Sequence, residues 1–109
     1  MAFNQLTAAE AERLALLAEE LAEAIALIGK VMRHGYESFN PDDEAAGNNA
    51  QQLAGELGDV HYAVQLLVVA GDLDEDEIIA ARRAAAIKKP EYLHHQTKAI
   101  LSVLSESAT

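Results

Sequence analysis

The sequence contains no cysteine, and only 5% of its 109 residues are aromatic. The absence of cysteine excludes disulfide bonds, thiolate metal sites and thiol catalysis. The chain also lacks an uninterrupted apolar run of about 18 residues and a charged-then-apolar signal pattern at its N-terminus. We therefore expect no membrane association, and we expect the protein to act in the cytoplasm.

Basic residues are also scarce: the chain has eight lysines and arginines against 18 aspartates and glutamates. Its formal net charge is −10. Affinity for a phosphate backbone needs a basic surface, so direct nucleic-acid binding is not expected. A small phosphorylated ligand could still bind this acidic chain through a metal ion.

Alanine, leucine and glutamate dominate the composition, which favours helix over sheet. The length fits a single domain over residues 1–109, and we predict an all-α fold, a compact bundle of about four helices. The first expected helix runs from a Thr7–Glu10 capping box to His34, and a loop over residues 36–47 follows it. The second helix runs from a cap at Asn48 or Asn49 to about Ala70. A third helix begins with a capping box at residues 74–77 and ends at a break at Pro90, and a last helix covers about Glu91 to Leu104. Residues 105–109 are expected to fray.

Apolar residues recur at helical spacing in the first two long helices. The predicted core stripes are Leu14, Leu17, Leu21, Ile25, Ile28 and Met32 in the first helix, and Leu53, Leu57, Val60, Val64 and Leu67 in the second. Between residues 64 and 70 only Gln65 is polar, so this segment needs cover on all sides. One small chain can hardly supply that cover, and we expect a homo-oligomer, either a dimer or a tetramer.

Carboxylates interrupt a second line on each of these helices. Glu20 and Glu23 lie between Leu16 and Leu27 at helical spacing, and Glu56 and Asp59 repeat the three-residue separation. A solvated acidic face is the simplest interpretation of one such pair, but two pairs on two neighbouring helices favour a site. Four carboxylates in a low-dielectric interior repel unless they are protonated or neutralised by bound cations.

The oxygen-only ligand set points to magnesium, with manganese as the alternative, rather than zinc or copper. A di-iron bundle is the closest structural competitor, but its helices carry Glu-x-x-His, and neither acidic pair here ends in histidine. Magnesium usually meets a protein through one or two carboxylates plus substrate phosphates. The pattern therefore indicates a polyphosphate ligand.

The acidic positions resemble a known motif. Glu19-Glu20-x-x-Glu23 followed by Glu56-x-x-Asp59 is similar to the motif of the MazG-type all-α nucleoside triphosphate pyrophosphohydrolases. Three further segments resemble the short single-domain members often found in phages and prophages: Arg33-His34-Gly35-Tyr36, Asn48-Asn49 and Tyr92-Leu93-His94-His95-Gln96. The resemblance covers about residues 14–96, and phage origin would place the protein in the host cytoplasm.

The resemblance implies magnesium-dependent hydrolysis of a nucleoside triphosphate, with deoxynucleotides expected, to a monophosphate and pyrophosphate. It implies that water attacks the α-phosphorus, and that the metal ligands are Glu20, Glu23, Glu56 and Asp59. Glu20 and Glu19 are the implied catalytic residues, with Glu19 orienting water or a ligand. The candidate substrate contacts are Lys88 first, then Arg83 and Lys89, together with Asn48, which could equally cap a helix, and Tyr36, which could equally anchor the loop.

Two other functions remain open at this point. Glu56-Leu57-Gly58-Asp59 would also suit a phosphoribosyl-ATP pyrophosphohydrolase of the same superfamily, although the segments around Arg33 and Tyr92 favour the MazG-like branch. The chain could instead be a non-catalytic helical interaction module. Retention of all five acidic positions disfavours that interpretation.

Overall fold

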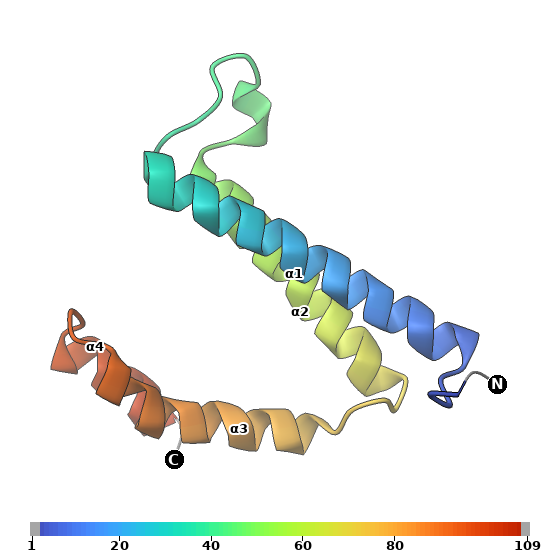
Figure 1. Cartoon of the computed structure of the whole chain (residues 1–109). Helices are drawn as coiled ribbons and strands as arrows, with labels where there is room; N and C mark the ends of the chain where they lie inside the picture. The colour runs from blue at the N-terminus through green and yellow to red at the C-terminus, as the bar shows by residue number, and fades with distance from the viewer. Residues whose placement is uncertain (1–2, 108–109) are drawn as a thin grey trace. The chain divides into compact units, whose positions relative to one another are not determined.

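The structure is a computed structural model that describes the backbone of residues 3–107 and the side chains of residues 3–106. Within this range the chain forms α1 (Ala8–His34), the 3₁₀ helix η1 (Glu44–Ala46), α2 (Asn49–Val69), α3 (Glu75–Lys88), the 3₁₀ helix η2 (Lys89–Tyr92) and α4 (Lys98–Ser107) (Figure 1). These residues contain no strand beyond one isolated bridge between Phe39 and Asn48. The prediction of an all-α chain with about four helices is confirmed. None of the helices within residues 3–107 has the length and apolar character that crossing a membrane requires.

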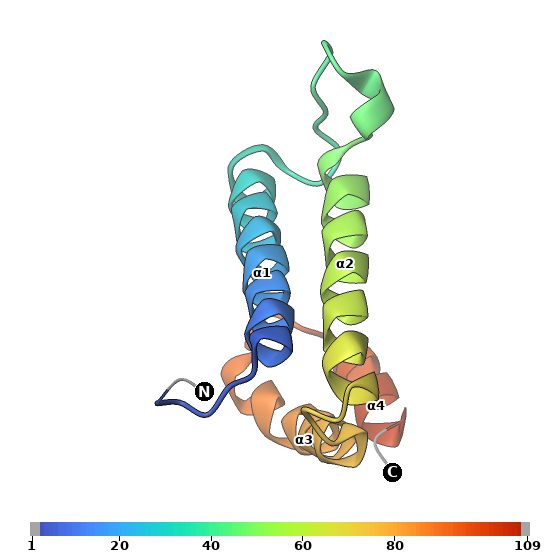
Figure 2. The same cartoon turned by 90° about the vertical axis from the view of Figure 1, so that its right-hand side faces the viewer.

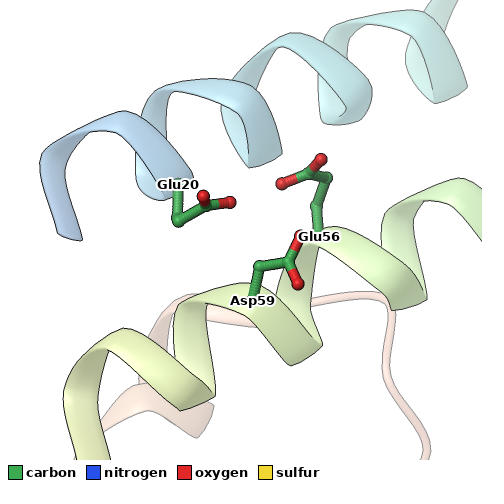
Figure 3. Close-up of side chains that lie close together, drawn as sticks. All are labelled: Glu20, Glu56 and Asp59. Atoms are coloured by element: carbon green, nitrogen blue, oxygen red, sulfur yellow. The ribbon is translucent and has the colours of Figure 1, made fainter. Parts of the chain in front are cut away.

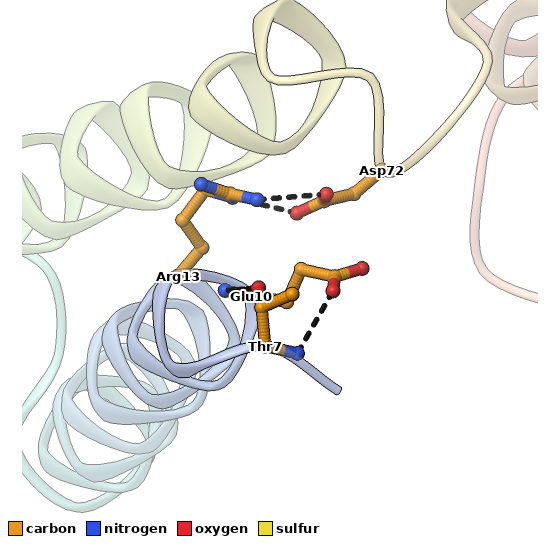
Figure 4. Close-up of polar contacts among 4 residues, drawn as sticks. All are labelled: Thr7, Glu10, Arg13 and Asp72. Atoms are coloured by element: carbon orange, nitrogen blue, oxygen red, sulfur yellow. Dashed lines mark hydrogen bonds and ion pairs between the residues drawn. The ribbon is translucent and has the colours of Figure 1, made fainter. Parts of the chain in front are cut away.

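Both ends of α1 follow from local sequence. Thr7 Oγ1 accepts a hydrogen bond from the Glu10 amide at 3.1 Å, and Glu10 Oε1 accepts one from the Thr7 amide at 2.9 Å, which forms the predicted capping box (Figure 4). At the other end, Gly35 has φ +87° and donates its N–H to the Val31 carbonyl at 2.7 Å. Glycine adopts this positive φ without the steric cost of a β-carbon, so the helix ends where the sequence predicts.

The loop before α2 supplies the hydrogen-bond acceptors that the start of this helix needs. The amides of Asn49 and Ala50 donate to the carbonyls of Ser38 and Tyr36 at 2.8 and 3.0 Å. The side chain of Asn48 accepts from the Gln51 amide at 2.9 Å, and Gln51 Oε1 accepts from the Asn48 amide at 2.8 Å. Asn48 is therefore a helix cap, and the loop is tied to the helix at its base.

α1 and α2 lie side by side and antiparallel in both views (Figures 1 and 2). Buried and half-buried side chains recur on each helix with alternating spacings of four and three residues, the pattern of two helices packed along their length. We call this contact the α1–α2 seam; it comprises Arg13, Leu17, Glu20, Ala24, Leu27 and Val31 of α1, and Asn49, Leu53, Glu56, Val60, Ala63 and Leu67 of α2.

The predicted core stripe of α1 is not the face that meets α2. Of its six members only Leu17 is half-buried, and the others are exposed, with Met32 reaching 82%. A two-helix hairpin buries only one face of each helix, and the line that carries Glu20 occupies that face of α1. The α2 stripe was predicted more accurately, because Leu67 is buried and only Leu57 of its five members is exposed.

Residues from Leu73 onward form a second compact unit. Asp74 caps α3 as predicted, although its side chain accepts from the Asp76 amide at 2.9 Å rather than from Glu77. α3 ends at Lys88, and Pro90 lies in the 3₁₀ helix η2, so the predicted break is confirmed. The expectation of a single domain stays a prediction.

The predicted last helix was wrong in both of its boundaries. α4 begins at Lys98 rather than Glu91, because Tyr92 ends η2 and Leu93 is extended. Thr97 provides the cap, since its Oγ1 accepts from the Ile100 amide at 3.2 Å. The helix continues to Ser107 and so includes three of the five residues expected to fray, and residues 108 and 109 lie outside the described residues.

A bidentate ion pair joins the second turn of α1 to Asp72, three residues after the end of α2. Arg13 Nε and Nη2 donate to Asp72 Oδ2 and Oδ1 at 2.7 and 2.9 Å, and both side chains are largely shielded from solvent (Figure 4). Two parallel charge-assisted bonds fix orientation as well as distance. The hydrogen bonds from Arg13 hold the pKa of Asp72 below its ordinary value of 3.8.

Substituting Asp72→Asn should lower the melting temperature at pH 7, because the guanidinium then loses its charged partner. A carboxyl whose pKa is lowered by folding stabilises above its ordinary pKa, so the difference from the parent should shrink as the pH falls through the lowered pKa of Asp72. Thermal melts of the parent, Arg13→Gln, Asp72→Asn and the double variant give the coupling free energy between the two side chains. Glu19→Gln, which removes an exposed acid away from Arg13, is the control, and additive effects of the two substitutions would contradict this prediction.

Candidate metal centre

Three carboxylates meet at the middle of the α1–α2 seam. Glu20 of α1 and Glu56 and Asp59 of α2 point toward one another, and each offers an oxygen within 4.8 Å of the other two (Figure 3). Glu20 and Glu56 occupy seam positions and are half-buried, whereas Asp59, one helical turn after Glu56, borders the seam and is exposed. We call these three residues the acidic cluster.

The remaining two predicted acidic residues lie differently. Glu23 is exposed and is not one of the three residues of the cluster, but its carboxyl is close enough to Glu56 to raise the pKa of that residue. Glu19 is exposed on α1, outside the cluster. Of the four predicted metal ligands, the structure therefore brings three together and places the fourth beside Glu56.

The cluster carries negative charge that the described part of the chain does not neutralise. Glu20 Oε2 and Glu56 Oε2 are shielded from solvent, and neither has a hydrogen-bond partner among the described residues. Within residues 3–106 the salt bridge is the one between Arg13 and Asp72, and no cation pairs with the cluster. Because shielded carboxylate oxygens without donors are unfavourable, the arrangement favours a bound proton or a cation.

The pKa of Glu56 reflects this environment. Partial burial is the largest cause, and the adjacent carboxyls of Glu20 and Glu23 add to it, raising the pKa of Glu56 from 4.5 to about 7. At neutral pH this site therefore exchanges a proton readily. A divalent cation would replace that proton and stabilise the ionised carboxylates together.

The donor set fits a hard divalent cation. All three groups are carboxylates, and oxygens on opposite sides of an octahedral magnesium ion lie about 4.2 Å apart. The oxygens of the cluster already lie within 4.8 Å of one another. Only one pair of the three oxygens can lie on opposite sides of the ion, and neighbouring oxygens lie about 3 Å apart, so binding one ion requires the side chains to rotate toward one another. The exposed Asp59 leaves the cluster accessible from solvent.

The structure places the predicted substrate contacts in different parts of the chain. The side chain of Asn48 is used as a cap, and Tyr36 is 62% exposed while its carbonyl holds the Ala50 amide. Arg83 and Lys88 belong to α3 and Lys89 to η2, all in the second unit. Their role at the acidic cluster stays a prediction.

Asn49 is a polar seam residue, which the sequence analysis named only as a possible helix cap and as part of the Asn48-Asn49 segment. It is only 1% exposed, its Nδ2 donates to the Gly35 carbonyl at 2.9 Å, and its Oδ1 has no partner among the described residues. It ties the end of α1 to the start of α2. Its spacing of seven residues from Glu56, two helical turns along the same face, was the signal that could have found it.

Comparison with protein families, with characterised proteins and with solved structures found no match to this chain. The resemblance to MazG-type enzymes therefore rests on the motif residues themselves.

In the presence of chelator, thermal stability should fall as the pH rises from about 5 to 8. The folded-state pKa of Glu56 is about 7 against an ordinary 4.5, so between these values the folded state binds more protons than the unfolded state. Stability therefore decreases with pH across that window. Melting curves of the parent and of Glu56→Gln at several pH values test this, and the variant should show a weaker dependence.

The matched control is Glu19→Gln, which removes one exposed acid next to Glu20 without touching the cluster. This variant should keep the pH dependence of the parent. Parallel curves for the parent and Glu56→Gln would show that the protonation of Glu56 does not influence folding.

Proposed function

We propose that this protein is a magnesium-dependent nucleoside triphosphate pyrophosphohydrolase that acts on the α–β phosphoanhydride bond. The observation that carries the proposal is the pair of shielded carboxylate oxygens, Glu20 Oε2 and Glu56 Oε2, which lack donors and lie in a cluster with the accessible Asp59. The similarity of both acidic motifs to the MazG-type pattern supports the same conclusion and narrows the substrate class to nucleotides, with deoxynucleotides expected.

In this proposal Glu20, Glu56 and Asp59 hold the metal, and Glu23 joins them from its place beside Glu56. A bound divalent cation supplies neutralisation of phosphate charge and a lower pKa for water. The packing of the seam fixes the directions from which Glu20 and Glu56 approach, so their carboxylates need little reorganisation. Glu19 is proposed to orient water from the neighbouring exposed position.

The reaction consumes one water molecule. The water oxygen bonds to the α-phosphorus, the α–β anhydride bond breaks, and pyrophosphate leaves with the bonding electron pair. The attacking water loses a proton to a carboxylate or to solvent. Lys88, with Arg83 and Lys89 after it, is proposed to balance phosphate charge, and Tyr36 is proposed to contact the base. A nucleotide-directed role fits a cytoplasmic location.

Asp59→Asn should reduce pyrophosphate release by about 100-fold or more, because it removes one metal ligand and one preorganised charge while preserving shape. The common NTPs and dNTPs are incubated with magnesium, with manganese or with chelator, and pyrophosphate and monophosphate are quantified. Glu12→Gln on the exposed side of α1 is the control and should keep full activity. Orthophosphate as the first product would contradict the proposed bond cleavage.

Melting curves separate a catalytic role of Asp59 from a structural one. Magnesium should raise the melting temperature of the parent more than that of Asp59→Asn, since stabilisation by a ligand scales with its affinity for the folded state. If no nucleotide is hydrolysed and magnesium leaves the parent unchanged, the non-catalytic interaction module is the better interpretation. Hydrolysis of phosphoribosyl-ATP alone would support the other member of the superfamily.

We also propose a homo-oligomer, a dimer or a tetramer. The exposed stripe of α1 and the 85% exposed Val69 of α2 are apolar surface that the hairpin leaves uncovered. Ile25→Asp should therefore lower the molar mass measured by light scattering at micromolar concentration. Ala26→Asp adds the same charge at an exposed position about 130° around α1 from the centre of the stripe and should leave the mass unchanged. A monomeric parent at that concentration would contradict this proposal.

A further inference from the structure

The second unit contains an apolar recess, and Lys89 is the one lining residue that the proposed hydrolysis also uses. α3, η2 and α4 enclose a volume of about 280 Å³. Its apolar walls are Ala85, Ala86, Pro90, Leu93, Leu101 and Leu104. The remaining two lining residues are cations, Arg82 and Lys89.

The recess exists because α3 presents small side chains to α4. Ala85 and Ala86 line the recess, and their side chains are too short to fill the space beside Leu101. Pro90 then ends the regular helix, and the chain turns so that Leu93 forms another wall. No side chain described in the second unit is buried, so these residues leave the apolar walls accessible. Covering them with an apolar ligand would remove apolar surface from water.

The two cations give the recess a charge preference. Arg82 and Lys89 are seven residues apart, so they lie on one side of α3 and its continuation, roughly 10 Å apart along the axis. Among the described residues no carboxylate lies within ion-pair distance of either. Both cations are exposed and can turn toward a ligand without giving up an internal partner. The recess therefore combines an apolar interior with an anion-attracting rim.

We propose that this recess binds a small monoanionic carboxylate with a hydrocarbon or aromatic body. The body fills the space beside Ala85 and Leu101, and the carboxylate pairs with Arg82 or Lys89. Arg82 is the stronger candidate, because its guanidinium can donate two parallel hydrogen bonds to a carboxylate. Phosphate-rich polyanions fit this site poorly, because its walls offer few polar groups. The site lies on the second unit, whereas the acidic cluster lies on the first, and binding does not depend on hydrolysis.

The test uses the full chain with octanoate as the probe and 1-octanol as the uncharged comparison, both well below micelle-forming concentrations. Methyl NMR reports the location of binding, with Ala85 and Leu101 as recess reporters and Ile25 and Ile28 as reporters of the exposed α1 stripe. Octanoate should shift the recess methyls saturably, and it should bind about tenfold more tightly than octanol. Equal affinity for octanol, or larger shifts at Ile25 and Ile28, would overturn the proposal.

Matched variants test the individual contacts. Arg82→Gln should weaken octanoate binding about tenfold and leave octanol unchanged, whereas Arg83→Gln, which alters a neighbour that does not line the recess, should leave both unchanged. Ala85→Leu should abolish binding of both probes by filling the recess. Equal losses of octanoate affinity in Arg82→Gln and Arg83→Gln would show that the net positive charge of the surface, and not a contact with Arg82, causes the effect. If the chemical shifts of the recess methyls change with protein concentration and not with octanoate concentration, a second copy of the chain occupies the recess, which would contradict the proposal.

Discussion

Carboxyl groups at packing positions between two antiparallel helices are the constraint on which the rest of this structure depends. The seam repeats every seven residues, and Glu20 and Glu56 occupy places where a helix pair that only had to pack would carry leucine. Fully burying a leucine is worth roughly 1.5–3 kcal/mol. The chain gives up that stabilisation at the centre of its main contact, and deviations of this kind are expected at functional sites. Apolar and small residues on both sides of the acids, including Ala24 and Ala63, keep the helices close there.

Polar contacts at both ends of the hairpin fix the register in which the acids meet. Arg13 pairs with Asp72 at one end, and Asn49 bonds to the carbonyl of Gly35 at the other. If the helices slipped by one turn, Glu56 would face an apolar seam residue instead of Glu20. The heptad spacing permits such a slip, because leucine and valine pack in several registers, whereas a bidentate ion pair and a buried amide do not. The two end contacts therefore maintain the geometry of the acidic cluster.

The features that the sequence predicted well depend on neighbouring residues. The capping box at Thr7, the cap at Asn48, the helix end at Gly35 and the break at Pro90 each involve groups within a few positions of one another. The residues of the acidic cluster could also be found from the sequence, because carboxylates at packing positions on two helices interrupt the apolar pattern. The contact between Arg13 and Asp72 spans 59 positions, and no local pattern indicates it.

Periodicity also failed to identify which face of α1 meets α2. It defines the faces of a helix, but it does not state which one receives the nearest partner, and the longest apolar stripe was the natural choice. The structure places Glu20 and Leu27 of the acidic line there instead, while Glu23 is exposed. The start of α4 was misplaced for a related reason, because a proline marks where one helix ends, whereas the next begins at its own cap, Thr97.

The arrangement around α1 determines whether assembly and access to the acidic cluster conflict. Successive residues of a helix advance by about 100°, so Glu23 lies roughly half a turn from the centre of the stripe formed by Leu14, Leu21, Ile25, Ile28 and Met32. The seam lies between the two. A partner that covers the stripe would therefore contact α1 on one side of the seam, while Glu23 borders the cluster from the other side. Because Asp59 is itself exposed, the carboxylates stay open to solvent from that side even when a partner covers the stripe.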